Sequence, residues 1–246
     1  MNEIIRSLIE RKSVRAFEPR NVEAELKAEI LNAALQAPSA GNMTLYTIID
    51  ITDQKLKDTL AITCDNQPFI AKAPLVFVFC ADYYRWYHAF CRHSENVRKP
   101  SFGDLNLATA DALIAAQNTV VAAESLGLGS CYIGDITERF EEHRELLSLP
   151  RYVVPVCMLV MGYPTEQQRK REKPRRFNAD DIVHTNCYQK EKADRMEEML
   201  MVRQDIGDEE ALSEYIHKFC KRKYNSDFSR EMSRSCEEML KSFCEE

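Results

Sequence analysis

Residues 104–134 read DLNLATADALIAAQNTVVAAESLGLGSCYIG. Up to Leu126 the stretch is rich in helix-forming residues and contains no proline or glycine, and Gly127 stands where a C-terminal cap glycine belongs. The pattern therefore predicts one long helix, a sharp turn at Gly127, and a short strand that ends at Gly134. Backbone in such a glycine-bracketed segment can come close to a planar ligand.

The long helix is apolar on two sides when its residues are placed at roughly 100° each. One side carries mostly small residues, namely Leu105, Ala108, Ala112, Ala115, Ala116, Thr119, Ala122, Ala123 and Leu126. The other side carries the bulky Leu107, Ile114 and Val121. A helix that is apolar on two sides is buried on two sides. We expect a central helix with its alanine face against a partner subunit; an ordinary core helix in a monomer is the alternative.

The composition sets limits on the class of protein. The chain has 246 residues, of which 45% are hydrophobic, enough for one sizeable core with an appendage. Its net charge of −6 argues against a general affinity for nucleic acid or anionic membranes. No apolar run approaches the roughly 20 residues of a membrane span, and the first residues lack the apolar centre of a signal peptide. Nine scattered cysteines without a C-x-x-C pair favour neither a disulfide framework nor a zinc site, and we expect a cytoplasmic location.

The remaining pattern predicts an α+β fold with a helix-flanked sheet. Residues 74–81 and 153–161 are continuous apolar runs, typical of strands buried on both faces. We expect a further strand at 45–51, and helices at 2–11 (with Ile4, Ile5, Leu8 and Ile9 inward), 23–36, 53–62, 191–202 and 229–243. Residues 165–190 are irregular and basic. The charged tail after residue 190 has too little apolar content for a core of its own, so it should pack on this body or on a partner.

Three clusters combine cations and hydroxyl groups: Arg11 with Ser13 and Arg15, residues 38–42 (PSAGN), and residues 173–175 (KPR). Together they offer the guanidinium forks, point charge and short hydroxyl donors that bind a mononucleotide phosphate. The common phosphate loops G-x-x-x-x-G-K-[ST] and G-x-G-x-x-G are absent from the sequence.

The order of these clusters resembles the FMN-dependent nitroreductase superfamily, in particular its branch of NADPH-dependent flavin and nitro reductases with a long C-terminal extension. The resemblance rests on residues 11–15 (RKSVR), 37–42 (APSAGN), 67–69 (QPF), 127–134 (GLGSCYIG), 162–164 (GYP), 173–175 (KPR) and 223–229 (KYNSDFS).

The resemblance implies a nitroreductase-like α+β fold, with a mixed sheet around the long central helix and a C-terminal arm that embraces the partner subunit. Residues 1–190 would be the FMN-binding core. Residues 191–246 would be a helical extension, part of the dimer and of the substrate pocket. The implied assembly is a homodimer with two flavins at its interface.

The resemblance also implies a set of FMN contacts. Arg11, Lys12, Ser13 and Arg15 would contact the phosphate, the ribityl chain and the pyrimidine edge, and Lys173 and Arg175 would complete the cationic site. Ser39 would reach FMN from the other subunit, and Gln67 and Phe69 would line the dimethylbenzene or ribityl side. The backbone of Gly129, Ser130, Cys131 and Tyr132 would lie along the isoalloxazine near N5.

The implied reaction passes hydride from NADPH through flavin N5 to nitroaromatic, quinone or free flavin acceptors in a ping-pong sequence. No catalytic side chain is required, and no metal. Arg203 and the run Arg169-Lys170-Arg171 are candidates for the 2′-phosphate of NADPH. Dehalogenation or flavin fragmentation on the same fold, and a flavin-binding store or sensor without turnover, are the alternatives.

Three other motifs have ordinary interpretations beside functional ones. Residues 83–87 could wall an acceptor pocket or form a packed aromatic corner. His88, Cys91 and His93 match no usual zinc spacing. The basic run 169–176 could bind nucleic acid, but a solvated loop partly used for a ligand phosphate fits an acidic protein better.

Overall fold

The computed structural model describes residues 1–244 and divides the chain into two compact units. The first unit comprises Met1–Arg171 and the described chain from Glu231 onward, and the second comprises Glu172–Arg230. The expected division into a core of 1–190 and an extension of 191–246 stays a prediction, because it concerns what the extension does in a dimer.

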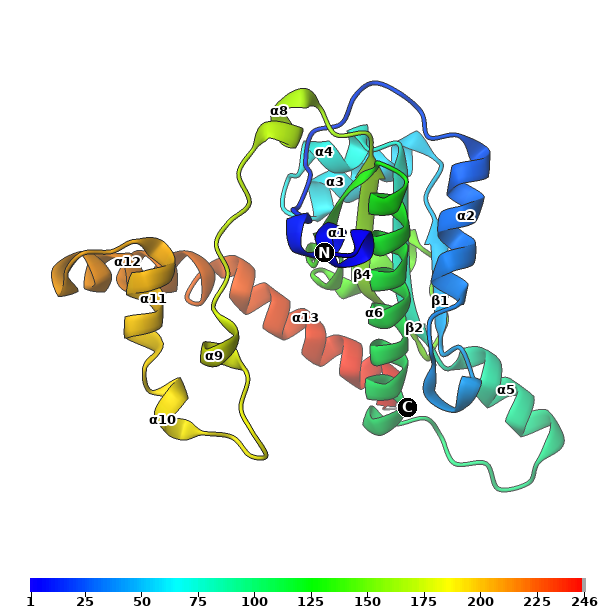
Figure 1. The fold of residues 1–246 in the computed structure, drawn as a ribbon. Helices are drawn as coiled ribbons and strands as arrows, with labels where there is room; N and C mark the ends of the chain where they lie inside the picture. The colour runs from blue at the N-terminus through cyan, green and yellow to red at the C-terminus, as the bar shows by residue number, and fades with distance from the viewer. Residues whose placement is uncertain (245–246) are drawn as a thin grey trace. The chain divides into compact units, whose positions relative to one another are not determined.

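The first unit is built on a four-stranded sheet of order β1-β2-β4-β3, with all strand pairs antiparallel (Figure 1). The strands are β1 (Tyr46–Asp50), β2 (Leu75–Asp82), β3 (Gly129–Ile133) and β4 (Val153–Gly162). A single parallel bridge, between Ser13 and Ser130, adds the N-terminal segment to the sheet. The two continuous apolar runs are the central strands β2 and β4, as the sequence predicts.

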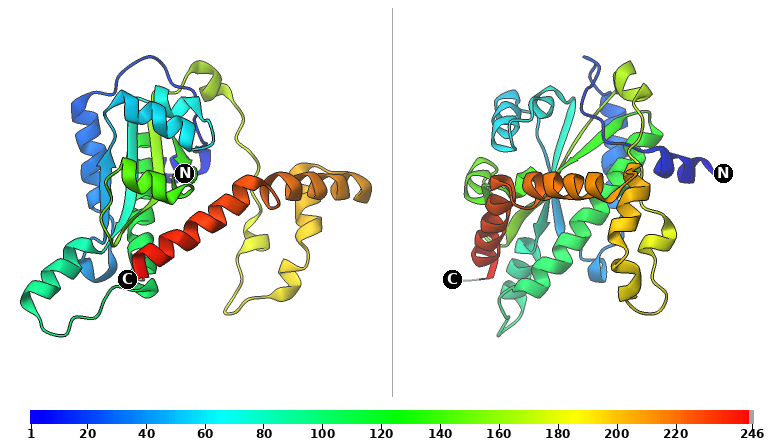
Figure 2. Two further views of the ribbon diagram at one scale, coloured as in Figure 1. Left: turned by 180° about the vertical axis from the view of Figure 1, so that it is seen from behind. Right: turned by 90° about the vertical axis from the view of Figure 1, so that its left-hand side faces the viewer.

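Both faces of the sheet are covered by helices, which explains why the central strands have no polar face (Figure 2). Val76 and Val78 point into a core with α3 (Gln54–Thr63) and α4 (Pro68–Lys72). Their neighbour Phe77 points into the opposite core, with α2 and α6. The helices of this unit not yet bounded are α1 (Glu3–Glu10), α2 (Ala24–Leu35), η1 (Ala40–Asn42), α5 (Tyr84–His93), α6 (Phe102–Ser125), η2 (Asp135–Thr137), α7 (Phe140–Leu146) and α8 (Glu166–Lys170).

Helix α6 is the long central helix that the sequence predicts. However, its alanine face, and not its bulky face, packs into the core of the chain. Ala112, Ala115, Ala116 and Ala123 are fully buried in the chain's own core. Small side chains let the helix lie close to bulky sheet residues such as Phe77. The prediction that the alanine face meets a partner subunit is therefore wrong.

The bulky side of α6 is the one left open in the single chain. Leu107 is 46% exposed and Ile114 is 40% exposed. Helix α1 shows the same reversal, because Ile4, Ile5, Leu8 and Ile9, expected to point inward, are each about half exposed. The single-chain core is already filled by α6, so these side chains have no place in it.

The aromatic residues after β2 form a packed corner, which is the ordinary interpretation of the motif. Trp86 donates its indole N–H to the carbonyl of Met43 at 2.6 Å. The rings of Tyr87 and Tyr152 meet edge to face with centroids 5.0 Å apart. Tyr83 is buried in the same cluster.

The last helix, α13 (Asp227–Cys244), packs its second half onto the first unit, as expected for a segment that cannot form its own core. Met239 and Phe243 are buried there. The Ser235 hydroxyl accepts from the Phe140 amide at 2.9 Å and donates to the Thr137 carbonyl at 2.7 Å.

The second unit contains α9 (Ala179–Ile182), α10 (Lys190–Ala193), α11 (Met196–Gln204), α12 (Glu209–Lys223) and the start of α13. The helix expected at 191–202 is divided between α10 and α11, and α12 has no counterpart in the sequence-based prediction. Met199, Leu200 and Leu212 are the buried apolar residues of this unit, in agreement with its low apolar content.

None of the described helices is long and apolar enough to cross a membrane. Within residues 1–244, no group of three or more histidine, cysteine or acidic side chains is arranged to hold a metal ion.

Glu138, between η2 and α7, is a buried carboxyl group without a hydrogen-bond partner for Oε1 among the described residues. Its side chain is only 7% exposed. Burial, reinforced by the carboxylates of Asp135, Asp65 and Glu231, raises its pKa from 4.5 to about 7, against the opposing charge of Arg139. The folded protein therefore holds this proton at a pH where the unfolded chain has lost it.

We expect Glu138→Gln to stabilise the protein in a pH-dependent way. Below pH 4.5 Glu138 is protonated in both the folded and the unfolded wild type, so variant and wild type differ little in free energy of unfolding. The difference grows as the pH rises from 4.5 to 7, and it reaches its full size above pH 7. At pH 8 the variant should be more stable by about 1–3 kcal/mol. Denaturant unfolding at pH 4.5 and pH 8 measures this. Glu145→Gln, at an exposed position of α7, is the control, and an equal effect of both substitutions would contradict the account.

Candidate functional site

The first predicted cluster lies against the start of β3. The Val14 amide donates to the Ser130 carbonyl at 2.8 Å, and Ser13 and Ser130 form the parallel bridge. The contact places the predicted residues Arg11, Ser13 and Arg15 beside the predicted segment 129–132, although 114 or more positions separate them in the sequence.

Gly129 permits this close approach. A Cβ atom built at Gly129 would lie 2.5 Å from Cγ2 and 2.8 Å from Cβ of Val14, closer than any real Cβ contact. Val14 is itself 3% exposed and cannot move away freely. The glycine is therefore required by the crossing of two backbones, whereas the sequence pattern predicts that this segment approaches a planar ligand.

Arg11 is positioned at the outer side of this crossing. Its Nη2 donates to the Ser130 hydroxyl at 3.4 Å, and its guanidinium carbon lies 5.9 Å from the centre of the Tyr132 ring. The Ser130 hydroxyl donates in turn to Glu124 at 3.4 Å. Burial raises the pKa of Glu124, and the nearby Arg11 charge opposes that rise. Arg11 Nε is buried and has no partner among residues 1–244, so this guanidinium has donor capacity for an anion.

Lys12, unlike Arg11, bonds to backbone carbonyl groups of the chain. Its ammonium donates to the carbonyl of Arg169 at 2.7 Å and to that of Arg171. Arg171 returns the contact by donating to the Ser13 carbonyl, while its Nε is buried without a partner among the described residues. These bonds tie the segment 11–15 to the end of α8 and to Arg171, the residue that follows it. Sequence reasoning placed Arg171 in a run for NADPH and did not anticipate its contact with Ser13.

Arg15 and Phe69 line one cavity of about 380 Å³, together with Phe17 and Lys72. The Arg15 amide donates to Gln168 Oε1 at 3.3 Å, which fixes the backbone at the cavity. Lys72 supplies a second cation that the sequence analysis missed. A signal for it existed, since it ends the short helix that begins at the predicted Gln67-Pro68-Phe69.

In the single chain the side chain of Gln67 bonds to the protein's own backbone. It precedes α4, and its side-chain amide donates to the Cys64 carbonyl at 2.9 Å. Cys131 is a buried thiol whose pKa is raised, chiefly by burial, so it stays protonated and unreactive. Burial likewise raises the pKa of Tyr132, whose hydroxyl donates to Gln117 at 3.3 Å.

Ser39 is held in a different part of the same unit. Its hydroxyl accepts from the Thr44 amide at 3.0 Å, and Asp111 of α6 accepts from the amides of Ala40 at 2.9 Å and Leu45 at 3.1 Å. Asp111 and Glu124 lie 13 positions apart on α6, which corresponds to roughly 20 Å along the axis. One chain therefore does not bring Ser39 to the Arg11 cluster.

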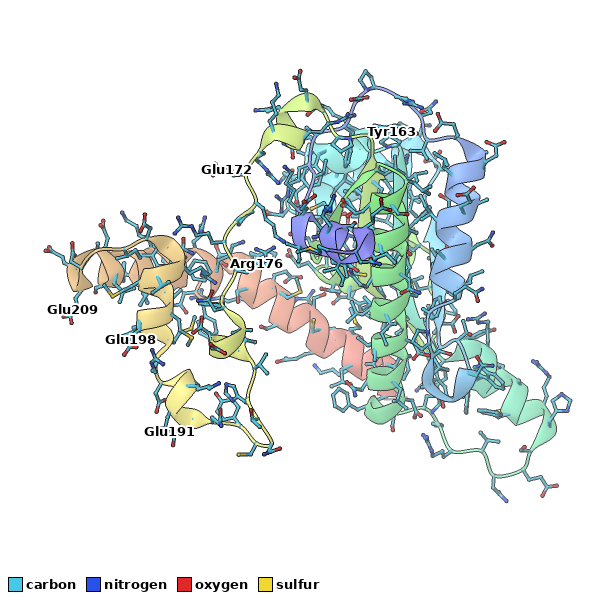
Figure 3. The ribbon with its side chains drawn as sticks, in the orientation of Figure 1. Tyr163, Glu172, Arg176, Glu191, Glu198 and Glu209 are labelled. Carbon is cyan, nitrogen blue, oxygen red and sulfur yellow. The ribbon has the colours of Figure 1, made fainter. Side chains whose placement is uncertain are left out.

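Lys173 and Arg175 belong to the second unit and are not placed relative to the first. Arg175 lines a cavity of about 310 Å³ there, with Arg176 (Figure 3), Phe177 and Arg203. The Arg203 guanidinium lies over the Phe177 ring, 4.0 Å from its centre. Three guanidinium groups around one cavity favour a phosphate-bearing ligand.

The first unit thus presents half-buried and exposed cations beside the strand segment on which Val14 packs. Arg11 Nε, which has no partner among the described residues, fits a phosphate-bearing ligand. No side chain among these residues is arranged as a nucleophile or as an acid–base pair, so the chemistry would come from the bound group.

Comparison with known proteins agrees with this geometry. Residues 8–163 match the profile of the nitroreductase family, and the chain belongs to that family. The FMN reductase (NADPH) of Bacillus subtilis strain 168 is 32% identical over 247 residues, covering 94% of this chain and 98% of the relative.

Two solved structures show the same fold. B. megaterium NfrA2 superposes with a TM-score of 0.76 at 30% identity, covering 96% of this chain and 98% of the other. The NADPH:FMN oxidoreductase from Vibrio harveyi complexed with NAD⁺ gives a TM-score of 0.74 at 29% identity, covering 83% and 86%. The predicted family and α+β fold are confirmed.

We expect Gly129→Ala to lower the free energy of unfolding by about 1–3 kcal/mol, because the new methyl group overlaps Val14. Gly134→Ala is the matched control: it follows the same strand, its φ is −77°, and nothing lies within 4 Å of the added atom. Chemical denaturation of both variants measures the difference. Equal stability of the two would show that the crossing is not tight.

Proposed function

We propose that this chain is an NADPH-dependent FMN oxidoreductase that reduces nitroaromatic compounds, quinones or free flavin in a ping-pong sequence. The observation that carries the proposal is the crossing of Val14 and Gly129, which gathers Arg11, Ser13 and Arg15 beside the backbone of residues 129–132. The family membership and the names of the relatives support it.

The chemistry that FMN would supply when bound is uptake of hydride at N5 and release of electrons to an acceptor. The chain would hold the phosphate and the pyrimidine edge with Arg11, Ser13 and Arg15. Lys12 donates to two backbone carbonyls, so we assign it to positioning this segment. The amides of residues 129–132 would donate to the ring near N5, and positive charge would stabilise the reduced anion. Phe69 and Lys72 would line the open side of the ring, and Gln67 would hold the start of α4.

We also propose a homodimer in which Ser39 serves the FMN site of the other subunit. The position of Ser39 far from Arg11 supports this, as does the exposed bulky side of α6 with Leu107 and Ile114. Lys173 and Arg175 would complete the cationic site. The cytoplasmic location stays a prediction.

The dimer predicts that sedimentation gives twice the chain mass of 28.4 kDa. Ile114→Glu should weaken association by at least tenfold, since it places a charge in an apolar interface. Ile62→Glu, the same substitution at an exposed isoleucine of α3, should leave association unchanged. A wild-type monomer at micromolar concentration would refute the proposal.

Anaerobic titration tests the activity. The purified, FMN-loaded protein should be bleached by one equivalent of NADPH per flavin, and a quinone added afterwards should restore the colour without further NADPH. Slow or absent bleaching would indicate a flavin store. Restoration that requires NADP⁺ to remain bound would contradict the ping-pong sequence.

Steady-state kinetics with NADPH and with NADH tests Arg203 as a ligand of the 2′-phosphate. Arg203→Ala should raise the KM for NADPH about 10-fold, the loss expected for one charge-assisted hydrogen bond, and leave the KM for NADH unchanged. Arg222→Ala is the control, because Arg222 also lies over a phenylalanine ring, that of Phe219 at 5.7 Å, outside the cavity. An equal change for both nucleotides would remove Arg203 from the phosphate site.

A further inference from the structure

A half-buried carboxyl group beside the candidate FMN site has no part in the proposed function. Glu124 stands in the last turn of α6, a turn that contains no basic residue. The carbonyl end of a helix carries partial negative charge, which disfavours a carboxylate there. Burial also raises the pKa of Glu124. A carboxyl group with a raised pKa next to a ligand site is a candidate for a functional role.

One hydroxyl group links Glu124 to Arg11. The Ser130 hydroxyl donates to Glu124 Oε1 at 3.4 Å and accepts from Arg11 Nη2 at 3.4 Å. Ser130 is fully buried, so water does not replace either partner of this hydroxyl. The carboxyl group therefore lies one hydroxyl away from a guanidinium that is proposed to bind the FMN phosphate.

The cations that face Glu124 come from the N-terminal segment. The charge of Arg11 is the largest influence that favours the ionised carboxylate, and Lys12 adds to it. On β3, Ser130 and Tyr132 are neutral, since burial raises the pKa of Tyr132. The charged residues of α1, which packs on α6, are all exposed to solvent: Glu3, Arg6 and Glu10. The charge of Glu124 therefore depends chiefly on what Arg11 binds.

An anion on Arg11 would change this balance. A phosphate monoester carries a charge of about −1.5 to −2 at pH 7, and like charge raises the pKa of a carboxyl group. Arg11 can bind such a group, because its Nε has no partner among residues 1–244. The Ser130 hydroxyl suits both states of Glu124, since it can donate to a carboxylate or accept from a carboxylic acid.

We propose that Glu124 takes up a proton from solvent when FMN binds, so that it weakens FMN binding as the pH rises. The inference rests on the proposed FMN-dependent function, with Arg11 as a phosphate ligand. Glu124 is a positioning residue that acts on the cofactor through Arg11 and Ser130. At low pH Glu124 is protonated before and after binding and has no effect. Once the free protein has lost this proton, binding has to recover it from solvent, which costs affinity.

Equilibrium dialysis of the FMN-loaded, full-length protein between pH 5 and pH 8 measures this effect. The ratio of the wild-type Kd to the Glu124→Gln Kd should rise from near one at pH 5 to about 10 at pH 8, the effect of a one-unit rise in pKa on binding. Both proteins share the ionisation of the FMN phosphate, so the ratio cancels it. Glu10→Gln is the control, because Glu10 precedes Arg11 but is exposed; its ratio should stay near one.

Riboflavin, which has the same ring and no phosphate, is the second probe. Its Kd ratio for wild type and Glu124→Gln should not change with pH. A change as large as that for FMN would overturn the proposal, because Glu124 would then not respond to the phosphate.

The other outcomes separate this inference from the proposed function. An FMN ratio that stays constant with pH would overturn the inference and leave the function intact, since FMN still binds. Weaker FMN binding by Glu124→Gln at every pH would also overturn it, because the carboxylate would then serve only to hold Arg11. A wild type that binds no FMN at any pH would overturn the proposed function, and this inference with it.

Discussion

The close crossing of Val14 over Gly129 is the constraint on which the rest of the site depends. It joins the N-terminal segment to β3 through one backbone hydrogen bond of 2.8 Å and leaves no room for a Cβ. Because of it, cations from residues 11–15 and the backbone of 129–132 face the same region. The contacts of Lys12 and Arg171 hold the other side of that segment.

Much of the fold could be predicted from the sequence, since the signals were long and uniform. The apolar runs of β2 and β4 indicate strands covered on both faces, and the two cores on either side of the sheet confirm this. The uninterrupted pattern of α6 gives its length within two residues. What the pattern does not contain is the identity of the surface that each apolar face meets. For that reason the alanine face of α6 was assigned to a partner subunit although it lies in the chain's own core, and the apolar face of α1 was expected to point inward although it is exposed.

The residue clusters of the candidate site could also be predicted from the sequence, but some of their contacts could not. Residue types and their order point to a phosphate-bearing flat ligand, and the structure brings Arg11, Ser13, Arg15 and residues 129–132 together. The partners of Lys12 could not be predicted, because they are backbone carbonyls 157 and 159 positions away and carry no sequence signal. Lys72 was missed because a lone lysine at the end of a short helix is usually solvated.

The most direct test of this account is hydrogen exchange at the Val14 amide in the FMN-loaded protein. If the crossing holds the site together, this amide should exchange as slowly as the amides of the β3–β4 ladder and far more slowly than those of the neighbouring exposed chain. Exchange of Val14 at the rate of the exposed residues of α1 would contradict the central claim.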